Sequence, residues 1–159
     1  MASRRSDKRR TVDGVQFLLA ESSGFLVRDA NRAFQRLLEK RIAPYGIARG
    51  QWYFLRVLWN EDGLSQRELS ARVGTMEPTT VIALRSMEKT GLIRRVRSAD
   101  DKRRSQVWLT PKAQRLRNEL LALARSITDE AENGIAREDL ASFRRIIARM
   151  TANLDRIKI

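Results

Sequence analysis

The sequence predicts a mostly helical fold that carries one small β-hairpin. Three observations support this prediction. Hydrophobic residues recur at helical spacing over most of the chain, two short helical patterns are joined by a glycine-containing turn, and a later segment alternates between apolar and polar residues as a strand does. At 159 residues, the chain is long enough to bury one core, so we expect residues 15–159 to form a single domain.

The composition excludes several classes of protein. Cys and His are both absent, which rules out a disulfide framework and any catalytic triad based on His or Cys. The adjacent acidic pairs stand at expected turns and helix ends, where carboxylates usually serve as solvated caps. We therefore expect no enzyme, no metal site and no cofactor. No apolar run near the start would serve as a signal peptide or membrane span, so we expect a cytoplasmic protein with no membrane partner.

The charge balance points to a polyanionic partner. The net charge is +13, from 32 Lys and Arg against 19 Asp and Glu. Part of this excess lies in residues 1–14, which we expect to form a flexible basic tail. Because many basic tails only aid solubility, this segment alone leaves open whether it touches nucleic acid.

Two helices are expected in the first third of the chain. Residues 12–42 predict a long amphipathic helix, with about 15–42 belonging to the domain. Its apolar stripe comprises Leu19, Leu26, Ala30, Ala33 and Leu37, widened by Phe34 and Leu38. This helix should end before Pro44, because the residue before a proline avoids the helical region. The following segment, RGQWYFLRVLWN at Arg49–Asn60, is apolar nearly all round, which predicts a buried helix.

A short helix is expected at Gln66–Val73. Ser65 and Glu68 have the spacing of a capping box, in which each side chain accepts a hydrogen bond from the backbone of the other. Leu64 and Leu69 stand at the positions of a hydrophobic staple. These signals define where the helix begins.

A second helix follows the interruption at Gly74. Pro78 stands in its first turn and Gly91 just past its end. The inward stripe comprises Val81, Leu84 and Met87, and Leu92 can close against Met87 in a Schellman-type stop. Two short helices across such a turn predict a helix-turn-helix, whose second member can enter the DNA major groove. Helix-turn-helices also occur as plain packing units, and that alternative stays open at this point.

The outward face of the second helix predicts contact with DNA. Thr and Arg can hydrogen-bond base edges or phosphates, and Ile82 can meet a thymine methyl group. We expect the DNA-binding residues of this motif to be Ser65, Gln66, Arg67, Thr75, Glu77, Pro78, Thr79, Thr80, Ile82, Arg85 and Ser86.

Two strands are expected after the helix-turn-helix, at residues 92–97 and 106–109. Val107 and Leu109 fall on one face of the second strand, whereas Gln106 and Trp108 fall on the other. The connecting loop is too long for a tight hairpin turn, so it should project as a wing. Its acidic residues can brace a neighbouring cation in position for a phosphate or a narrow minor groove. The DNA-binding residues expected here are Asp101, Lys102, Arg103 and Arg104, and the alternative is a solvated loop with no partner.

The C-terminal third predicts a dimer. Thr110 and Pro111 have the chemistry of a helix start, and Leu116, Leu120, Leu123 and Ile127 follow at helical spacing. A last helix then carries a heptad seam of Leu140, Phe143, Ile147, Met150, Leu154 and Ile157. Such a stripe is more often intramolecular core. Because this helix has few neighbours in the sequence order to pack on, we favour a seam between two subunits over about 111–157.

These blocks together resemble the MarR family of winged helix-turn-helix regulators. The resemblance rests on the segments GLSQRELSARV, PTTVIALRSMEKTGLIRR, DDKRRSQVWLT and PKA and covers nearly the whole chain from about Val15. It implies a winged region at about 48–110 between terminal dimerisation helices, in which Asp101 braces and Arg103 inserts. The family's wing motif is usually Asp-Arg-Arg, and Lys102 departs from it, which puts a bidentate contact at that position in doubt. The resemblance also implies a homodimeric repressor on a roughly palindromic operator in double-stranded DNA.

The same resemblance implies a small effector, often aromatic and acidic, and we extend this expectation to an acyl thioester. Phe25, Arg28 and Arg32 share one side of the first helix, and Trp52, Arg56 and Trp59 lie on the second. We expect these six residues to bind it. The alternative is that the arginines are solvated and the tryptophans are core.

A second function class remains open on the sequence alone. A constitutive architectural or RNA-binding protein could use the same basic surface without reading a sequence. The aromatic side chains of single-strand RNA modules do not stand on a strand platform in this chain, which lowers that alternative.

Overall fold

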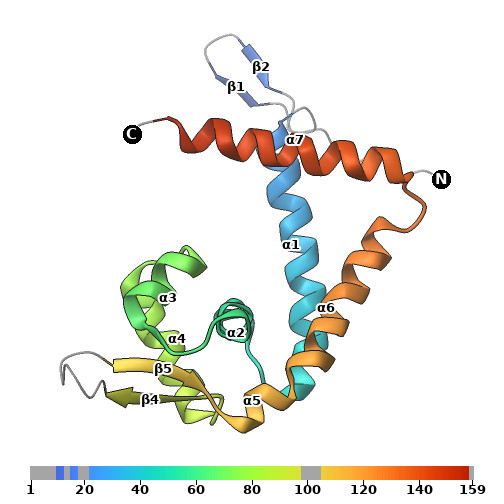
Figure 1. Ribbon diagram of the computed structural model, residues 1–159. Coiled ribbons are helices and arrows are strands. Elements are labelled where there is room, and N and C mark those ends of the chain that lie inside the picture. Colours follow the sequence, from blue (N-terminus) through green and yellow to red (C-terminus); the bar gives the residue numbers. More distant parts are fainter. Residues whose placement is uncertain (1–9, 13–14, 18–21, 98–104, 158–159) are drawn as a thin grey trace. The chain divides into compact units, whose positions relative to one another are not determined.

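Most of the chain is helical, and a small antiparallel sheet lies near its middle (Figure 1). The computed structural model describes the backbone of residues 10–12 and 15–17 and the whole of residues 22–97 and 105–157. In chain order the elements are β1 (Arg10–Val12), β2 (Val15–Phe17), α1 (Ser23–Ile42), the 3-10 helix η2 (Ala43–Tyr45), α2 (Arg49–Asn60), β3 (Leu64–Ser65), α3 (Gln66–Val73), α4 (Glu77–Lys89), β4 (Ile93–Arg97), β5 (Ser105–Leu109), α5 (Pro111–Arg115), α6 (Arg117–Glu132) and α7 (Arg137–Asp155). The described residues divide into two compact units between Asn118 and Glu119.

The first helix is shorter than the sequence predicts. α1 begins at Ser23, where the hydroxyl of Ser22 accepts a hydrogen bond from the backbone N–H of Phe25 at 3.3 Å. The expected start near residue 12 is wrong, because β1 and β2 pair as antiparallel strands there. The β-branched residues of both strands favour an extended backbone over a helix. Leu19 lies outside the described residues.

α2 is buried on most of its circumference, as predicted. Its buried side chains are Gln51, Trp52, Phe54, Leu55, Leu58 and Trp59. However, the helix is not apolar all round, since Tyr53, Arg56 and Asn60 form an exposed stripe. α2 contacts α1, α3, α4 and β5. It is therefore the central support of the first unit.

The helix-turn-helix has the predicted ends. Ser65 donates its backbone N–H to the Glu68 carboxylate at 2.8 Å, and Glu68 returns its own N–H to the Ser65 hydroxyl at 3.3 Å. At the other end of α4, Gly91 adopts φ +69° and Leu92 N–H donates to the Met87 carbonyl at 2.9 Å. This is the predicted Schellman stop. This stop fixes the direction in which the chain leaves α4.

The wing sheet has three strands in the order β3-β5-β4. Ile93 pairs with Leu109 in the β4–β5 ladder, and Val107 and Leu109 are buried, as the alternation predicts. β3, which the sequence did not predict, adds Leu64 opposite Val107. Gly63 precedes β3 with φ +76°, and a Cβ there would lie 2.6 Å from a ring carbon of Trp108. Only glycine fits this turn without displacement of the ring.

The C-terminal helices also follow the predicted pattern in part. The Thr110 hydroxyl accepts from Ala113 N–H at 3.3 Å at the start of α5. The chain then breaks at Leu116 before α6, which the continuous apolar spacing did not predict. In the second unit, Arg144 of α7 donates to the Glu132 carboxylate of α6 at 2.7 and 2.9 Å. Within the described residues, no helix combines the length and apolarity that crossing a membrane requires.

Candidate nucleic-acid interface

The outward face of α4 is fully open. Glu77, Pro78, Thr79, Ile82, Arg85 and Ser86 are all exposed, and Ile82 is 70% exposed. The opposite face packs on the core through Leu84 and Met87, which are completely buried. A helix anchored on one side, with hydroxyl, guanidinium and methyl groups on the other, can offer these groups to base edges.

Thr80 is the member of the predicted set that points inward. Its side chain is 0% exposed, and its hydroxyl lies 2.9 Å from that of Thr75. Thr75 in turn offers its carbonyl to the Ser70 hydroxyl at 2.7 Å. These contacts hold the turn between the two helices, so Thr80 and Thr75 position α4. The steps from Thr80 to Leu84 and Met87 were the signal in the sequence that this threonine shares the buried stripe.

The residues at the start of α3 serve different purposes. The Ser65 side chain is engaged in the capping box, and Gln66 is half-buried. Arg67 is exposed. Among these three predicted residues, Arg67 is the one with an open side chain for a phosphate contact.

Ser86 receives a contact that the sequence did not indicate. Gln51 of α2 is only 3% exposed, and its Nε2 donates to the Ser86 hydroxyl oxygen at 2.9 Å. The side-chain oxygen of Gln51, Oε1, accepts from the backbone N–H of Ala48 at 2.9 Å, which closes the start of α2. A single buried amide therefore joins the start of α2 to the exposed face of α4. Because its neighbours on α2 are apolar, no periodic signal marked Gln51.

The base of the wing is strongly basic. Arg94 and Arg97 of β4 are exposed, and Arg95 lies 3.6 Å from the Glu88 carboxylate of α4. The predicted wing residues Asp101, Lys102, Arg103 and Arg104 fall outside the described residues. The exposed arginines of β4 were absent from the predicted set, although the segment IRRVR contains them.

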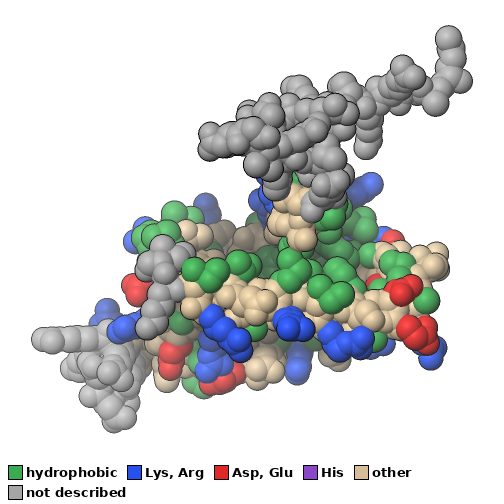
Figure 2. Space-filling model, turned by 90° about the horizontal axis from the view of Figure 1, so that it is seen from above, with side chains coloured by type: hydrophobic (Ala, Val, Ile, Leu, Met, Phe, Trp, Pro, Cys, Tyr) green, Lys and Arg blue, Asp and Glu red, His purple; other side chains and the backbone are tan. Residues whose placement is uncertain are grey.

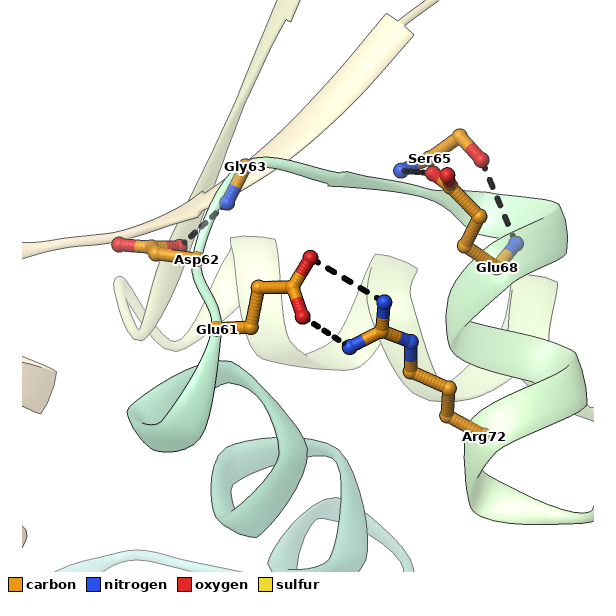
Figure 3. A network of polar contacts seen from close by, with 6 residues as sticks. All are labelled: Glu61, Asp62, Gly63, Ser65, Glu68 and Arg72. Atoms are coloured by element: carbon orange, nitrogen blue, oxygen red, sulfur yellow. Dashed lines mark hydrogen bonds and ion pairs between the residues drawn. The ribbon is translucent and has the colours of Figure 1, made fainter.

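A second polar network joins α2 to α3. Both terminal nitrogens of Arg72 donate to the Glu61 carboxylate, one of them at 3.1 Å (Figure 3). This hydrogen bond lowers the pKa of Glu61 and raises the pKa of Arg72. The next residue, Asp62, accepts from Gly63 N–H at 3.0 Å and from Leu109 N–H of β5 at 2.9 Å. The end of α2 is thereby fastened to α3 and to the wing.

The six predicted ligand residues form two groups. On α1, the Arg28 guanidinium lies 4.8 Å from the centre of the Phe25 ring, and Arg32 is exposed. On α2, Trp52 and Trp59 meet edge to face at 5.9 Å, and Arg56 lies 5.8 Å from the Trp52 ring. Both tryptophans are buried, and Trp59 donates its indole N–H to the Ala113 carbonyl at 3.0 Å. α1 buries only Leu38 and Ile42, in its last two turns, and the residues around Arg28 and Arg32 are exposed.

α7 carries the predicted seam on an open surface. None of its residues is buried, and Leu154 is 65% exposed. Leu140, Ile147 and Met150 are half-buried, whereas Phe143, Leu154 and Ile157 are exposed, together with Ile146. α7 ends at Asp155, so Ile157 lies just past the helix. Figure 2 shows hydrophobic side chains along this helix, with Lys and Arg side chains beside them.

The fold and the open face of α4 define a winged helix-turn-helix protein. Comparisons with known proteins give the family. The sequence profile of the MarR family matches residues 45–104. The chain is 31% identical over 103 residues to the HTH-type transcriptional regulator TtmR of Methylorubrum extorquens (strain PA1), an alignment that covers 65% of this chain and 53% of that protein. The chain thus spans about half the length of this relative.

Two solved structures share the fold of this chain over nearly their whole length. A MarR transcriptional regulator from Methanosarcina mazei Go1 has a TM-score of 0.77 at 27% identity and covers 85% of this chain and 97% of its own. The transcriptional regulator PA3341 has a TM-score of 0.74 at 31% identity, over 86% and 100% of the two chains. The chain belongs to the MarR family of transcriptional regulators, which is not a family of enzymes. The predicted fold class and family are thereby confirmed.

Two further structures share the fold at 20% identity. The first is MepR of Staphylococcus aureus in a complex with DNA, with a TM-score of 0.77 over 83% of this chain and 98% of that one. The second is CouR of Rhodococcus jostii RHA1 bound to p-coumaroyl-CoA, with a TM-score of 0.71 over 83% and 93%.

Proposed function

We propose that this protein is a sequence-specific transcriptional regulator that binds double-stranded DNA as a homodimer and responds to a small effector. The observation that carries the proposal is the outward face of α4. Its polar and apolar side chains are exposed while the opposite face is anchored in the core. Such a helix presents a constant surface to the major groove.

In this proposal the residues of α4 make different kinds of contact with DNA. Thr79 and Arg85 hydrogen-bond base edges or phosphates, and Ile82 contacts a thymine methyl group. Arg67 binds a phosphate beside the groove. On the wing, Arg103 enters a neighbouring minor groove, braced by Asp101, and Lys102 and Arg104 contact phosphates.

The homodimer is proposed to form through the seam on α7. A row of large apolar side chains that are exposed or half-buried in one chain is unfavourable in water, and a second copy of the same row removes it from solvent. A two-fold dimer would place two α4 helices on the two halves of a palindromic operator. MepR, which shares the fold, was solved with DNA. Repression by occupancy of the operator is the simplest outcome of this arrangement.

The effector is proposed to be an aromatic or acidic small molecule, which includes acyl thioesters. CouR, of the same fold, was solved with p-coumaroyl-CoA. In this chain, Phe25, Arg28 and Arg32 of α1 combine one ring with two cations. If they form the effector site, Arg28→Ala should reduce the effect of the ligand on operator binding.

Selection of bound fragments from the source genome, followed by anisotropy titrations, tests the proposal. One palindromic site should bind at least about a thousandfold more tightly than a scrambled duplex at the same salt. Arg103→Ala should weaken specific binding by roughly 1 to 3 kcal/mol, and Thr79→Ala should relax base preference more than it lowers non-specific affinity. Equal affinity for all duplexes, or preference for RNA, would instead favour the constitutive architectural or RNA-binding protein.

A further inference from the structure

An Asn-Gly pair stands at the turn that joins α6 to α7 (Figure 1). Asn133 and Gly134 lie between Glu132, which ends α6, and Arg137, which begins α7. Neither residue belongs to the surfaces described above, and both are exposed. The chemistry of this pair is therefore open to water on the folded chain.

Asparagine side chains react with their own backbone when the next residue permits it. The backbone nitrogen of that residue attacks the side-chain carbonyl carbon, Cγ, and closes a five-membered succinimide ring. The nitrogen must be free of a hydrogen bond, and the chain must leave the fixed dihedral angles of a helix. Glycine in the next position favours the reaction, since it has no side chain to obstruct the ring and adopts more backbone conformations than other residues.

The turn meets these requirements at Gly134. This glycine has φ +79°, and no atom beyond its chain neighbours lies within 4 Å of the position that a Cβ would occupy. Among the described residues, the Gly134 N–H donates no backbone hydrogen bond. The adjoining N–H groups of Asn133 and Ile135 are both engaged, at 3.4 and 3.1 Å from backbone carbonyls. The nitrogen that the reaction needs as its nucleophile is thus the free one of the three.

The other asparagines lack this combination. All of them lie in helices and precede a residue with a longer side chain, and they are Asn31, Asn60, Asn118 and Asn153, followed by Arg32, Glu61, Glu119 and Leu154. Gly63 gives a second contrast. Its N–H donates to the Val107 carbonyl at 3.0 Å, and the preceding Asp62 carries a carboxylate, which nitrogen attacks less readily than an amide. Asn133 is therefore the asparagine that sequence and fold together leave reactive.

We propose that Asn133 is a site of spontaneous covalent modification, at which the chain forms a succinimide and then aspartate or isoaspartate. The Gly134 nitrogen gives up its proton to the solvent and bonds to Cγ of Asn133, and the side-chain nitrogen leaves as ammonia. Water then opens the ring at either carbonyl. One product is aspartate. In the other, isoaspartate, the main chain runs through the former side chain and is longer by one methylene group. The net reaction consumes one water and releases one ammonia, with no oxidation or reduction.

Both products change the joint between α6 and α7. The new carboxylate stands next to Glu132, whose own carboxylate accepts from Arg144 of α7 at 2.7 and 2.9 Å, and it competes for that guanidinium. Isoaspartate also lengthens the backbone of the turn, which shifts the start of α7 relative to α6. In a two-fold dimer each copy carries the same shift. The modified chain should therefore dimerise more weakly through the apolar row of α7, a consequence that rests on the proposed function.

Incubation of the full chain at mildly alkaline pH, followed by tryptic digestion, tests the site against a sample digested before incubation. Cleavage after Arg125 and Arg137 yields the peptide of residues 126–137, in which Asn133 is the sole asparagine. Mass spectrometry should show the exchange of its amide for a carboxyl group, and an isoaspartyl methyltransferase should label the isoaspartate. Asn133 should react at least about tenfold faster than any helical asparagine. The folded chain should react within about tenfold of the rate of the isolated 126–137 peptide, because the turn leaves the reacting nitrogen free.

Asn133→Gln is the decisive variant, since its longer side chain would have to close a larger ring, and its 126–137 peptide should stay unlabelled. Asn153→Gln is the matched control, exposed on α7, and should be labelled like the parent. Sedimentation should show that the incubated parent dissociates at a several-fold higher concentration than incubated Asn133→Gln.

Three outcomes would overturn the site: label in the Asn133→Gln peptide, equal rates at the helical asparagines, or a folded rate far below that of the isolated peptide. Equal dissociation of labelled and unlabelled dimers would refute the effect on α7. A chain that is labelled at Asn133 but was monomeric before incubation would refute the proposed dimer and leave the modification site standing.

Discussion

α4 and α7 are both amphipathic helices, yet the chain treats them in opposite ways. α4 buries Thr80, Leu84 and Met87 completely against its own unit. α7 carries a longer apolar row and buries none of it. Hydrophobic periodicity therefore identifies the face that must be covered, but it does not say whether the same chain supplies the cover. The apolar face of α4 is covered by other residues of the same chain. The apolar face of α7 is suited to cover by a second copy of the chain.

The polar contacts of the two helices differ as well. The turn before α4 is held by hydrogen bonds from the Ser70 hydroxyl to the Thr75 carbonyl and between the Thr75 and Thr80 hydroxyls. α7 begins at Arg137, and its side-chain contacts, such as that of Arg144 with Glu132, are exposed. A region that reads DNA needs one fixed geometry, and buried satisfied hydrogen bonds supply it. An association surface can be completed later by its partner.

We expect the strongest effect on stability from a substitution on the buried face of α4. Leu84→Ala removes a completely buried side chain and should lower the free energy of unfolding by about 3 to 5 kcal/mol. Urea denaturation followed by tryptophan fluorescence measures it. Ile82→Ala, on the exposed face of the same helix, is the control and should change stability by less than about 0.5 kcal/mol. Equal losses in the two variants would mean that α4 is not oriented as described.

The second prediction concerns dimerisation through the apolar row of α7. Leu154→Asp leaves a single chain little affected, because Leu154 is largely exposed, but places an unpaired charge in the proposed seam. The dimer should lose roughly 3 kcal/mol of association free energy. Light scattering at micromolar protein should then report a monomer. Ala152→Asp adds the same charge off the stripe, on the exposed part of α7, and should stay dimeric. A folded and dimeric Leu154→Asp variant would place the seam elsewhere.

Local chemistry made much of the fold predictable. The ends of α3 and α4 depend on neighbours within a few residues, such as Ser65 with Glu68 and Met87 with Leu92, so the sequence alone located them. β3 escaped prediction because two residues carry no pattern, and only the pairing of Leu64 with Val107 makes them a strand. Helical spacing alone predicts a start of α1 that is too early, whereas the Ser22 cap marks the observed start.

The site was predictable where exposure follows from helical periodicity. Thr79, Ile82 and Arg85 fall on the open face as expected. Thr80 was assigned to DNA because its polarity outweighed its place on the buried stripe. The Gln51 contact joins residues far apart in the sequence, and no local pattern encodes such a pair. Long-range polar contacts are thus the part that required the structure.

The third prediction concerns the buried side-chain amide of Gln51. Gln51→Leu removes the hydrogen bonds to Ser86 and to Ala48 N–H and should cost about 1 kcal/mol of stability. It should also lower operator affinity, because Gln51 helps to position α4 against α2. A double-mutant cycle with Ser86→Ala isolates the direct contact, and a coupling energy of at least about 0.5 kcal/mol is expected. Strict additivity would mean that the Gln51–Ser86 bond does not position the helix.

The smallest expected effect concerns pH and the ion pair that joins α2 to α3. The hydrogen bond from Arg72 holds the pKa of Glu61 below its ordinary value in the folded chain. A carboxyl group with a depressed folded pKa contributes stability above its unfolded pKa, and that contribution is lost as the pH falls through the folded pKa. The raised pKa of Arg72 has the opposite sign, so its contribution is lost only in strongly alkaline solution. Because both side chains are solvent-exposed, the effect should be smaller than any above.

Glu61→Gln isolates this contribution. The parent should be slightly more stable than the variant at neutral pH, and the difference should shrink as the pH falls through the folded pKa of Glu61, which the Arg72 hydrogen bond holds below the ordinary value. Urea titrations of both proteins at each pH measure it, and added salt should shrink the difference at neutral pH, because exposed charges are screened. Glu88→Gln is the matched control, since Glu88 lies 3.6 Å from Arg95 and not in this network. A difference that persists unchanged at low pH would mean that Glu61 stabilises the α2–α3 junction through the shape of its side chain, because the charge is then absent.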